Sequence, residues 1–447
     1  MKRVVVLAAL GGTAHAGGMF LPIRGVNGLE HAGATVAGSE DADSLFDNPA
    51  GLAHLGGSGH KWEFSVDGTY VNQAVDYTRT DSGGNVLPMV SSDYPGITAP
   101  SLAIAYALTD KLVIAGGFYA PYAGIGRYSP SGPERYTSAS LAESLFVTLV
   151  AGASWKLTDT LRVGATVQNT ISKLESRVTL SGCPGETICA PEDPDFDADT
   201  KLSQLGLFAP AASGGIQWDA HPMVTLGAYV QTPTRITNAT GKLETKLPSS
   251  SFFDGASVQG DEVTLEMNLP AIVKFGAQLR PTKHIDIDLA MDIELWSIQR
   301  AITIDPHNVT IQNSAGVGTY TLGEVTIPRN YSNSYAPSIA FEYHQDRWQV
   351  GAGYSYETAA ASPEYVSTLT VDSSKHIIGV GGGYDFWGWN VSGAFGYVKL
   401  NDVNLALADA KVGQLSPIRD QPDFVAVNAG DYRSHYVLFG ARLAHKF

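Results

Sequence analysis

Two neighbouring stretches decide the fold: VTLEMNLPAIVKFGAQL at residues 263–279 and HIDIDLAMDIELW at residues 284–296. Apolar side chains occupy every second position, from Val263 to Leu279 and again from Ile285 to Leu295. This period of two places alternate side chains on opposite faces of a β-strand. Strands of soluble sheets average about five or six residues, whereas strands that cross a membrane in a barrel are longer and tilted. The length of these stretches therefore favours a transmembrane barrel.

The composition agrees with a large membrane barrel. The chain of 447 residues is 44% hydrophobic and only 16% charged, with 20 Tyr, 16 Phe and 7 Trp. This is too little charge and too much aromatic content for a disordered chain. The longest apolar runs fall short of the roughly 18–20 residues that a membrane-spanning helix needs. With 29 Lys and Arg against 44 Asp and Glu, the formal charge is −15, which argues against nucleic acid as a partner.

Turn signals divide the chain into 14 strands. Short turns are expected near 109–111, 158–159, 219–222, 281–283, 345–346 and 385–388. Longer polar stretches lie between them, near 81–98, 121–138, 180–200, 241–260, 305–330, 359–371 and 401–430. Short and long connections alternate, as in bacterial outer-membrane barrels, which have short periplasmic turns, longer outer loops and an even strand number. We therefore predict an all-β fold, a 14-stranded antiparallel transmembrane β-barrel in the bacterial outer membrane.

Aromatic residues and the C-terminus agree with this orientation. Six of the seven Trp lie near an expected short turn or at the start of the first strand, where they would form an interfacial girdle. Trp296 is the exception. The last strand places Val437, Phe439 and Leu443 on one face and ends at Phe447, which resembles the recognition signal of the barrel assembly machinery. The alternative for this segment is an ordinary amphipathic edge strand.

The N-terminus predicts export. Lys2 and Arg3 precede the apolar run Val4 to Leu10, and Thr13 to Ala16 offers a cleavage site, so residues 1–16 are predicted to be a signal peptide. The alternative is a buried first strand. An exported chain passes through an oxidising compartment, so we expect a disulfide between Cys183 and Cys189, with two free thiols as the alternative.

No metal site and no cofactor are predicted. Within the acidic stretch 192–199, the run from Asp193 to Asp199 imitates the start of a calcium loop, but counted from Asp193 it has Ala198 at the sixth position and Gln204 at the twelfth. A helix-loop-helix calcium site needs Gly and Glu there. Whether this loop binds divalent ions at the cell surface or only carries solvated charge stays open.

Residues 17–59 lack the strand period and precede the barrel, which we place at 60–447. Asn48 can cap a helix that starts at Pro49 and runs through Ala50 to Leu55. We predict that residues 17–59 form a partly helical plug inside the lumen. Glycines at 379 and 381–383 would leave room for it, although bulges or bends in a strand would also explain them.

The phrase Glu40-Asp41-Ala42-Asp43-Ser44-Leu45-Phe46-Asp47-Asn48-Pro49-Ala50-Gly51-Leu52 resembles the plug of the FadL family of outer-membrane fatty acid and hydrocarbon transporters. The likeness continues at Leu269-Pro270-Ala271 and through Trp348 to Tyr356. It implies a transport channel and not an enzyme. Hydrophobic compounds, such as long-chain fatty acids or hydrocarbons, would be taken up through an apolar pocket, plug movement and a lateral exit.

The resemblance also implies site residues. Asn48, Pro49 and Ala50 would form the gate, with a purely structural capping turn as the alternative. The lateral exit would lie on the third strand, expected at Lys111 to Ala120, where Gly116, Gly117 and Pro121 can interrupt the ladder. We expect Asn48 to satisfy backbone groups exposed at that gap. A possible outer ligand groove consists of Tyr119, Tyr122, Arg127 and Tyr128.

A fatty acid needs a cation for its carboxylate, whereas a neutral hydrocarbon needs none. Candidates are Lys274, Arg162, Arg280, Arg127 and Arg135, and no motif selects among them. Outer-membrane lipids and lipopolysaccharide are expected neighbours of the barrel. The alternative function is a general diffusion porin for small polar solutes. An outer-membrane hydrolase is not supported, because the sequence has no G-x-S-x-G elbow.

Overall fold

The computed structural model describes residues 15–16, 23–141, 144–185, 187–315, 318–418 and 424–447. Residues 1–14 of the predicted signal peptide and residues 17–22 of the predicted plug therefore lie outside the described residues. His15 and Ala16 form a short strand, β1 (His15–Ala16), which pairs in parallel with β22 (Ala359–Ala360).

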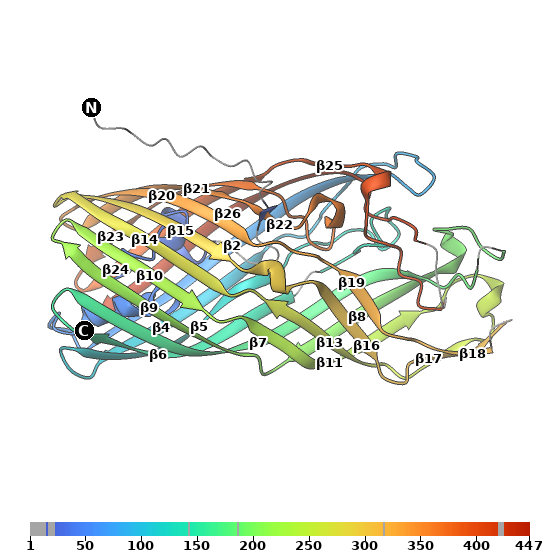
Figure 1. Cartoon of the computed structure of the whole chain (residues 1–447), viewed down its shortest axis with the longest axis horizontal. Coiled ribbons are helices and arrows are strands. Elements are labelled where there is room, and N and C mark those ends of the chain that lie inside the picture. The colour runs from blue at the N-terminus through green and yellow to red at the C-terminus, as the bar shows by residue number, and fades with distance from the viewer. Residues whose placement is uncertain (1–14, 17–22, 142–143, 186, 316–317, 419–423) are drawn as a thin grey trace, which may run out of the picture.

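Fourteen long strands of the described chain form a closed antiparallel barrel, which confirms the predicted fold class (Figure 1). They are β2 (Trp62–Arg79), β4 (Ile97–Ala107), β5 (Leu112–Gly124), β6 (Ser144–Lys156), β7 (Leu161–Ser181), β9 (Pro210–His221), β10 (Val224–Gln231), β14 (Ile272–Thr282), β15 (Ile285–Glu294), β20 (Ser334–Gln345), β21 (Trp348–Glu357), β23 (Lys375–Phe386), β24 (Trp389–Leu400) and β26 (Gly430–Lys446). The first and last of these strands close the barrel, in a ladder that runs from Glu63 opposite Lys446 to Arg79 opposite Gly430.

All six predicted short turns are present, and they lie at the same end of the barrel as the C-terminus (Figure 1). They join β4 to β5, β6 to β7, β9 to β10, β14 to β15, β20 to β21, and β23 to β24. In the last of these turns both Trp387 (φ 51°) and Gly388 (φ 82°) have positive φ. Two-residue hairpins favour this conformation because it matches the twist of the flanking strands.

At the opposite end, the long connections carry more strand than we predicted. Five further strands pair one after another, starting on the half of β7 that is farther from the short turns, and extend the wall of the barrel (Figure 1). They are β8 (Asp197–Gly206), β11 (Thr234–Lys246), β13 (Glu262–Leu269), β16 (Ala301–Pro306) and β19 (Val325–Pro328). We call these five strands the outer tier. We call the half of the barrel next to the short turns the lower half and the other half the upper half. Shorter strands are β3 (Val90–Ser91), β25 (Val403–Leu405), and a separate sheet of β12 (Ser257–Gln259), β17 (Thr310–Ser314) and β18 (Gly318–Thr321).

The stretch 263–279 is not one continuous strand, and this part of the prediction is wrong. β13 ends at Leu269 and β14 begins at Ile272, and both residues are buried. The inward positions therefore change from odd numbers to even numbers across Pro270 and Ala271. Pro270 cannot donate a ladder hydrogen bond, so a strand break is favoured at this point. As a result Leu265 is 1% exposed on the inside, whereas Phe275 is 50% exposed on the outside.

The N-terminal segment lies inside the barrel near the end with the short turns (Figure 1). It contains α1 (Gly25–Glu30), α2 (Ser44–Asp47) and the 3₁₀ helix η1 (Pro49–Leu55). Leu45, Leu52 and Leu55 pack against small apolar residues of β4, β5 and β6. Other 3₁₀ turns are η2 (Pro194–Phe196), η3 (Ser251–Phe253), η4 (Trp296–Ile298), η5 (Pro363–Tyr365) and η6 (Leu407–Asp409). None of the helices among the described residues has the length and apolar character needed to cross a membrane.

Candidate functional site

The two faces of β7 exchange polarity halfway along the strand. In its lower half the inward positions are polar, at Thr166, Gln168, Thr170 and Ser172, and the outward positions are apolar at Val163, Ala165, Val167 and Ile171, with Asn169 as the exception. In its upper half Leu174, Val178 and Leu180 point inward, and Lys173, Glu175 and Arg177 point outward. The lower half therefore suits lipid outside and a polar lumen, whereas the upper half stands in water and turns its apolar side inward.

Strand β2 changes in the same way. Its inward positions are polar from Glu63 to Thr69 and apolar at Val71, Val75 and Tyr77. The outer tier continues the upper pattern, because Lys201 and Glu266 face outward while Leu202 and Leu265 face inward. A strand that stands in water is expected to bury its apolar side. In this barrel that side is the interior.

These inward side chains enclose an apolar cavity of about 70 Å³ in the upper half of the barrel. Its apolar lining comes from β7, the outer tier and neighbouring loops: Leu174, Val178, Leu180, Leu202, Leu243, Leu265, Met267, Leu269, Ile302, Ile304, Leu322, Val325, Ile327, Leu369 and Leu415. We call it the upper cavity. The largely aliphatic lining is suited to a hydrophobic group or to part of an apolar chain.

One buried cation lies on the wall of the upper cavity. Arg329 follows β19 directly and is 1% exposed. Its Nη1 donates to Thr370 Oγ1 at 3.0 Å, but Nε and Nη2 have no hydrogen-bond partner among the described residues. Burial lowers the pKa of the Arg329 guanidinium, but the group stays cationic because its ordinary value exceeds about 12. A buried charge without a partner is costly, and an anionic group bound beside it would offset that cost.

The five cations that the sequence suggested for this role are already paired. Each has a carboxylate partner within 3 Å: Lys274 with Asp292 (2.7 Å), Arg162 with Asp219 (2.8 Å), Arg280 with Glu40 (2.9 Å), Arg127 with Asp93 (2.7 Å) and Arg135 with Asp197 (2.7 Å). No ion pair joins Arg329 to any other described residue. Arg329 is therefore the best candidate for binding an anionic ligand, and it was absent from the sequence-based candidates.

Aromatic rings connect the upper cavity to β5. The Tyr331 ring stacks edge-to-face on Trp296 with centroids 5.6 Å apart, and Trp296 meets Tyr122 of β5 at 6.3 Å. Tyr331 also lies against the Arg329 site, because its hydroxyl is 3.2 Å from Thr370 Oγ1. Trp296 is 2% exposed. This explains why Trp296 was the exception to the girdle, since it lines the lumen.

The ladder of β5 is interrupted at Ala120 and Pro121. Its pairing with β4 ends at Tyr119 opposite Ser101, and its pairing with β6 shifts register between Tyr119 and Tyr122. Gly116 and Gly117, which we expected to contribute to the interruption, are paired on both sides. The interruption therefore lies at the proline, because Pro donates no hydrogen bond.

The predicted outer groove is not a surface feature. Tyr119, Tyr122 and Tyr128 are each no more than 6% exposed. Tyr119 packs on Phe46 of the plug, with ring centroids 4.9 Å apart. Only Arg127 is on the surface, where it pairs with Asp93. Because all three tyrosine side chains are buried, they point into the lumen and not toward the cell exterior.

The predicted gate residues of the plug pack against β6, β7 and β9. Asn48 Nδ2 donates to the Val36 carbonyl at 2.7 Å and to the Ile216 carbonyl of β9 at 3.1 Å, and Asn48 Oδ1 caps the Ala50 N–H at 3.2 Å. Our expectation that Asn48 satisfies backbone groups of the third strand is therefore wrong. Ser154 Oγ of β6 donates to the Ala50 carbonyl at 2.9 Å.

Two glycines of the wall make this close approach possible. A Cβ at Gly215 would lie 1.9 Å from Asn48 Oδ1, and a Cβ at Gly164 would lie 2.3 Å from the Pro49 carbonyl carbon. Any larger residue at either position would push η1 away from the wall. Asn48, Pro49 and Ala50 are therefore seated directly on the barrel backbone.

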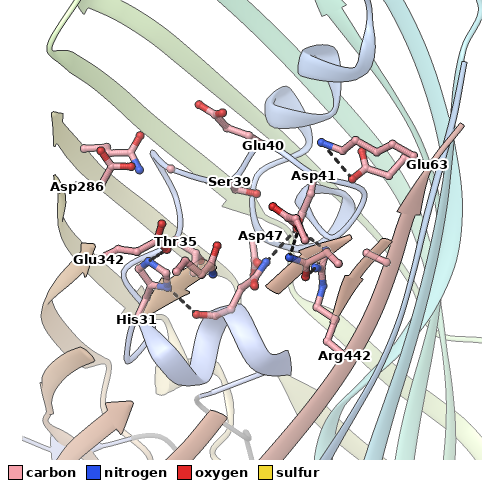
Figure 2. Close-up of a pocket in the computed structure, with 18 of the residues that line it drawn as sticks. His31, Thr35, Ser39, Glu40, Asp41, Asp47, Glu63, Asp286, Glu342 and Arg442 are labelled. Carbon is pink, nitrogen blue, oxygen red and sulfur yellow. Dashed lines mark hydrogen bonds and ion pairs between the residues drawn. The ribbon is translucent and has the colours of Figure 1, made fainter. Parts of the chain in front are cut away.

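The acidic stretch before Asn48 ties the plug to β26 (Figure 2). Asp43 accepts hydrogen bonds from Arg442 Nε at 2.7 Å and from Ser65 Oγ at 2.5 Å, and Asp41 accepts from Arg442 Nη2 at 2.5 Å. Ala42 between them is fully buried. The acidic-small-acidic pattern thus allows two carboxylates to bind one guanidinium while the small residue between them packs against the barrel.

Comparison with known proteins decides the family. A model of the family described as "Outer membrane protein transport protein (OMPP1/FadL/TodX)" matches residues 7–443. The chain belongs to this family. The FadL/TodX family consists of outer-membrane transport channels and not of enzymes, so this protein is an outer-membrane channel for hydrophobic compounds.

Solved structures show the same FadL/TodX fold. The crystal structure of a Pseudomonas aeruginosa FadL homologue superposes with a TM-score of 0.77 at 16% identity, over 96% of this chain and all of that chain. The Pseudomonas putida toluene transporter TodX superposes with a TM-score of 0.65 at 15% identity, over 96% and 99%. A putative outer membrane protein of Neisseria meningitidis serogroup B is 32% identical over 138 residues, which are 29% of this chain and 28% of that relative.

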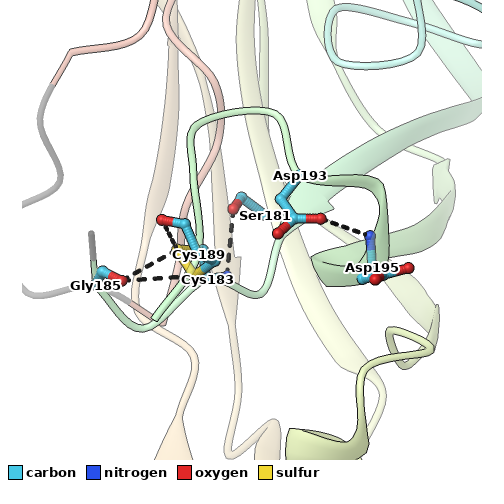
Figure 3. Close-up of a disulfide and its surroundings, with 6 residues drawn as sticks. All are labelled: Ser181, Cys183, Gly185, Cys189, Asp193 and Asp195. Atoms are coloured by element: carbon cyan, nitrogen blue, oxygen red, sulfur yellow. Dashed lines mark hydrogen bonds between the residues drawn. A yellow bond between two sulfur atoms is a disulfide. The ribbon is translucent and has the colours of Figure 1, made fainter. Parts of the chain in front are cut away.

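The outer loops of this FadL/TodX-family barrel carry a disulfide. Cys183 and Cys189 are bonded, with their Cα atoms 5.9 Å apart (Figure 3). Both side chains are buried in a small cluster with Phe196 and Phe253. In the neighbouring acidic run, Asp197 pairs with Arg135. Asp199 pairs with Arg177. These pairings leave fewer carboxylates for a divalent ion than the sequence suggests.

Proposed function

We propose that this channel takes up long-chain fatty acids or amphiphiles of the same chemistry, in which an apolar chain carries one carboxylate. The observation that supports the proposal most strongly is Arg329, a buried guanidinium whose Nε and Nη2 lack partners, on the wall of an otherwise largely aliphatic cavity. A carboxylate can accept two parallel hydrogen bonds from a guanidinium. The leucines of the outer tier would then hold the chain. A neutral hydrocarbon would leave Arg329 unpaired.

We propose further that the ligand leaves the lumen sideways at β5. The aromatic contacts from Tyr331 through Trp296 to Tyr122 supply an apolar surface from the upper cavity to the interruption at Pro121. Movement of the plug at Asn48, Pro49 and Ala50 would open this route, because Phe46 of the plug packs on Tyr119 next to it. The outward apolar face beyond β5 would deliver the ligand to outer-membrane lipids, inside the lipopolysaccharide layer. C-terminal Phe447 would be read by the barrel assembly machinery.

Binding of a fluorescent long-chain fatty acid to the purified channel, followed by uptake in cells, tests the proposal. Saturable binding and channel-dependent uptake are expected for the acid. Equal uptake with and without the protein would refute it. Saturable binding of toluene alone, with no binding of the acid, would favour the neutral hydrocarbon.

Single-channel conductance tests the alternative of a general diffusion porin. The plug occupies the lumen with its carboxylates bound to Arg442, so the wild type is expected to pass almost no ions. A large and steady conductance would support the porin and contradict the proposed uptake mechanism.

A further inference from the structure

A second polar cluster lies at the other end of the lumen, where the plug meets β15 and β20. Asp286 and Glu342 are paired residues of these two adjacent strands. On the same strands, His344 lies two residues after Glu342, and Asp288 lies two residues after Asp286. His31 is the C-cap residue of α1. His31 and Glu342 lie next to each other at the edge of a cavity of about 490 Å³, which Asp286 also lines (Figure 2). This lower cavity is distinct from the upper cavity.

Both histidines direct one ring nitrogen at the carboxylates. His344 Nε2 is 3.0 Å from the Lys283 carbonyl, and His31 Nδ1 is 2.9 Å from the Asn27 carbonyl. Because a carbonyl can only accept, each of these nitrogens carries the proton. In the neutral ring the other nitrogen then presents a lone pair. A backbone carbonyl that fixes the ring in this way is the usual partner of a metal-binding histidine.

The distances between the donor atoms suit a shared ion better than direct hydrogen bonds. His344 Nδ1 lies 3.5 Å from Glu342 Oε1 and 3.9 Å from Asp286 Oδ2. Hydrogen bonds of this type span about 2.7–3.2 Å. Two ligand atoms that are each about 2.1 Å from a tetrahedral zinc ion lie about 3.4 Å apart. One donor atom from each of Asp286, Glu342 and His344 fits within a span of 4.8 Å.

Asp288 lies next to this cluster, two residues from Asp286 on β15. It is 2% exposed, and neither carboxylate oxygen accepts a hydrogen bond of ordinary geometry from the described residues. Its Oδ2 lies 3.9 Å from His31 Nε2, and His31 Nε2 is also 3.5 Å from Glu342 Oε2. Asp288 and Glu342 thus both face the ring of His31 in a partly buried space. Such an arrangement is unfavourable unless a cation offsets the repulsion.

We propose that a divalent transition-metal ion binds His344 Nδ1, Glu342 and Asp286 at this cluster. Imidazole and carboxylate ligands together suit Zn²⁺ and its neighbours in the first row. The ion enters from the end of the barrel with the short turns, since His344 is 39% exposed. It offsets the charge of the carboxylates that face His31 and so stabilises the docked position of α1. This inference does not depend on the identity of the transported ligand.

Zinc titration of the purified full-length channel in detergent tests the site, with any affinity tag removed. The wild type binds one Zn²⁺ per chain with saturation, and a Co²⁺-loaded sample shows the visible absorption of a low-symmetry site. His344→Ala and Glu342→Gln each weaken binding at least tenfold. The matched control is His221→Ala, at the end of β9 beside a short turn, which leaves the affinity unchanged. Heat-modifiable electrophoretic mobility verifies that each variant is folded.

Absence of saturable binding, or equal affinity in the wild type and in folded His344→Ala and Glu342→Gln, overturns the site. Hydrogen exchange over residues 25–30 tests the effect on the plug. Zinc slows exchange of these amides in the wild type and not in His344→Ala. Binding that leaves this exchange unchanged overturns the stabilising role.

Discussion

Replacement of Arg329 by methionine separates the charge of the site from its shape. Methionine retains a long apolar side chain on the wall of the upper cavity but cannot donate hydrogen bonds. The change removes a guanidinium that has one hydrogen bond, to Thr370, and two nitrogens without partners among the described residues. We expect opposite effects on the empty and the loaded channel.

The magnitude follows from the contacts. A hydrogen bond to a charged group contributes about 1.5–3 kcal/mol, and about 1.4 kcal/mol corresponds to a tenfold change in affinity. Loss of the guanidinium therefore weakens fatty-acid binding roughly 10- to 150-fold. The corresponding fatty alcohol, which has no carboxylate, keeps its affinity within a few-fold. The empty channel becomes more stable, because an unpaired buried charge is replaced by an apolar side chain.

Isothermal titration with a fatty acid and with its alcohol, together with thermal unfolding, measures these effects. Arg127→Met is the matched control, because Arg127 is exposed and paired with Asp93. Unchanged affinity of Arg329→Met for the acid would refute the proposed head-group site. An equal loss for acid and alcohol would show that the substitution acts through packing alone.

Three other substitutions test the plug, the route and a buried acid. Asn48→Ala removes hydrogen bonds to Val36 and Ile216, so we expect about 2 kcal/mol weaker docking of η1, measured as faster hydrogen exchange there. Trp296→Ala breaks the aromatic contacts between the upper cavity and β5; uptake is expected to fall while equilibrium binding changes less. Glu134 is fully buried, and burial raises its pKa to about 7. Because the folded state holds this proton more tightly than the unfolded state, stability falls as pH rises from about 4.5 to 7, by roughly 3 kcal/mol. Glu134→Gln should make that fall smaller in a thermal-unfolding series, and a pH dependence equal to that of the wild type would contradict this assignment.

The barrel could be predicted because its signals are local. Alternation along each strand and six short turns follow from neighbouring residues, and each turn needs only two or three polar positions. The plug could be located for the same reason, since residues 17–59 lack the strand period and Asn48-Pro49 marks a helix start. Even so, the break at Pro270 shows that a period alone does not reveal which face points inward.

The binding site could not be predicted, because its selectivity depends on contacts between distant residues. Arg280 looked as suitable for a carboxylate as any other cation, but it pairs with Glu40, which lies 240 positions away. Arg329 is distinguished only by the absence of such a partner in the described chain, and it lies in a stretch that was expected to be an outer loop. The one signal available was the exchange of polarity along β7, whose polar side chains point inward at Thr166 and outward at Lys173. This exchange marks where the wall leaves the membrane.

That exchange of polarity also bears on the direction of transport. Below the upper cavity the inward side chains of β7 and β2 are polar, and the plug fills this part of the lumen with buried charges such as Asp43 and Arg442. Moving an alkyl chain from an apolar cavity into such surroundings costs about 0.8 kcal/mol for each methylene. A sideways step at Pro121 instead passes from Tyr122 to the lipid-facing side of the barrel, and the chain stays in apolar surroundings. We therefore infer that the ligand follows this lateral route, because the straight path to the periplasm is the more costly one.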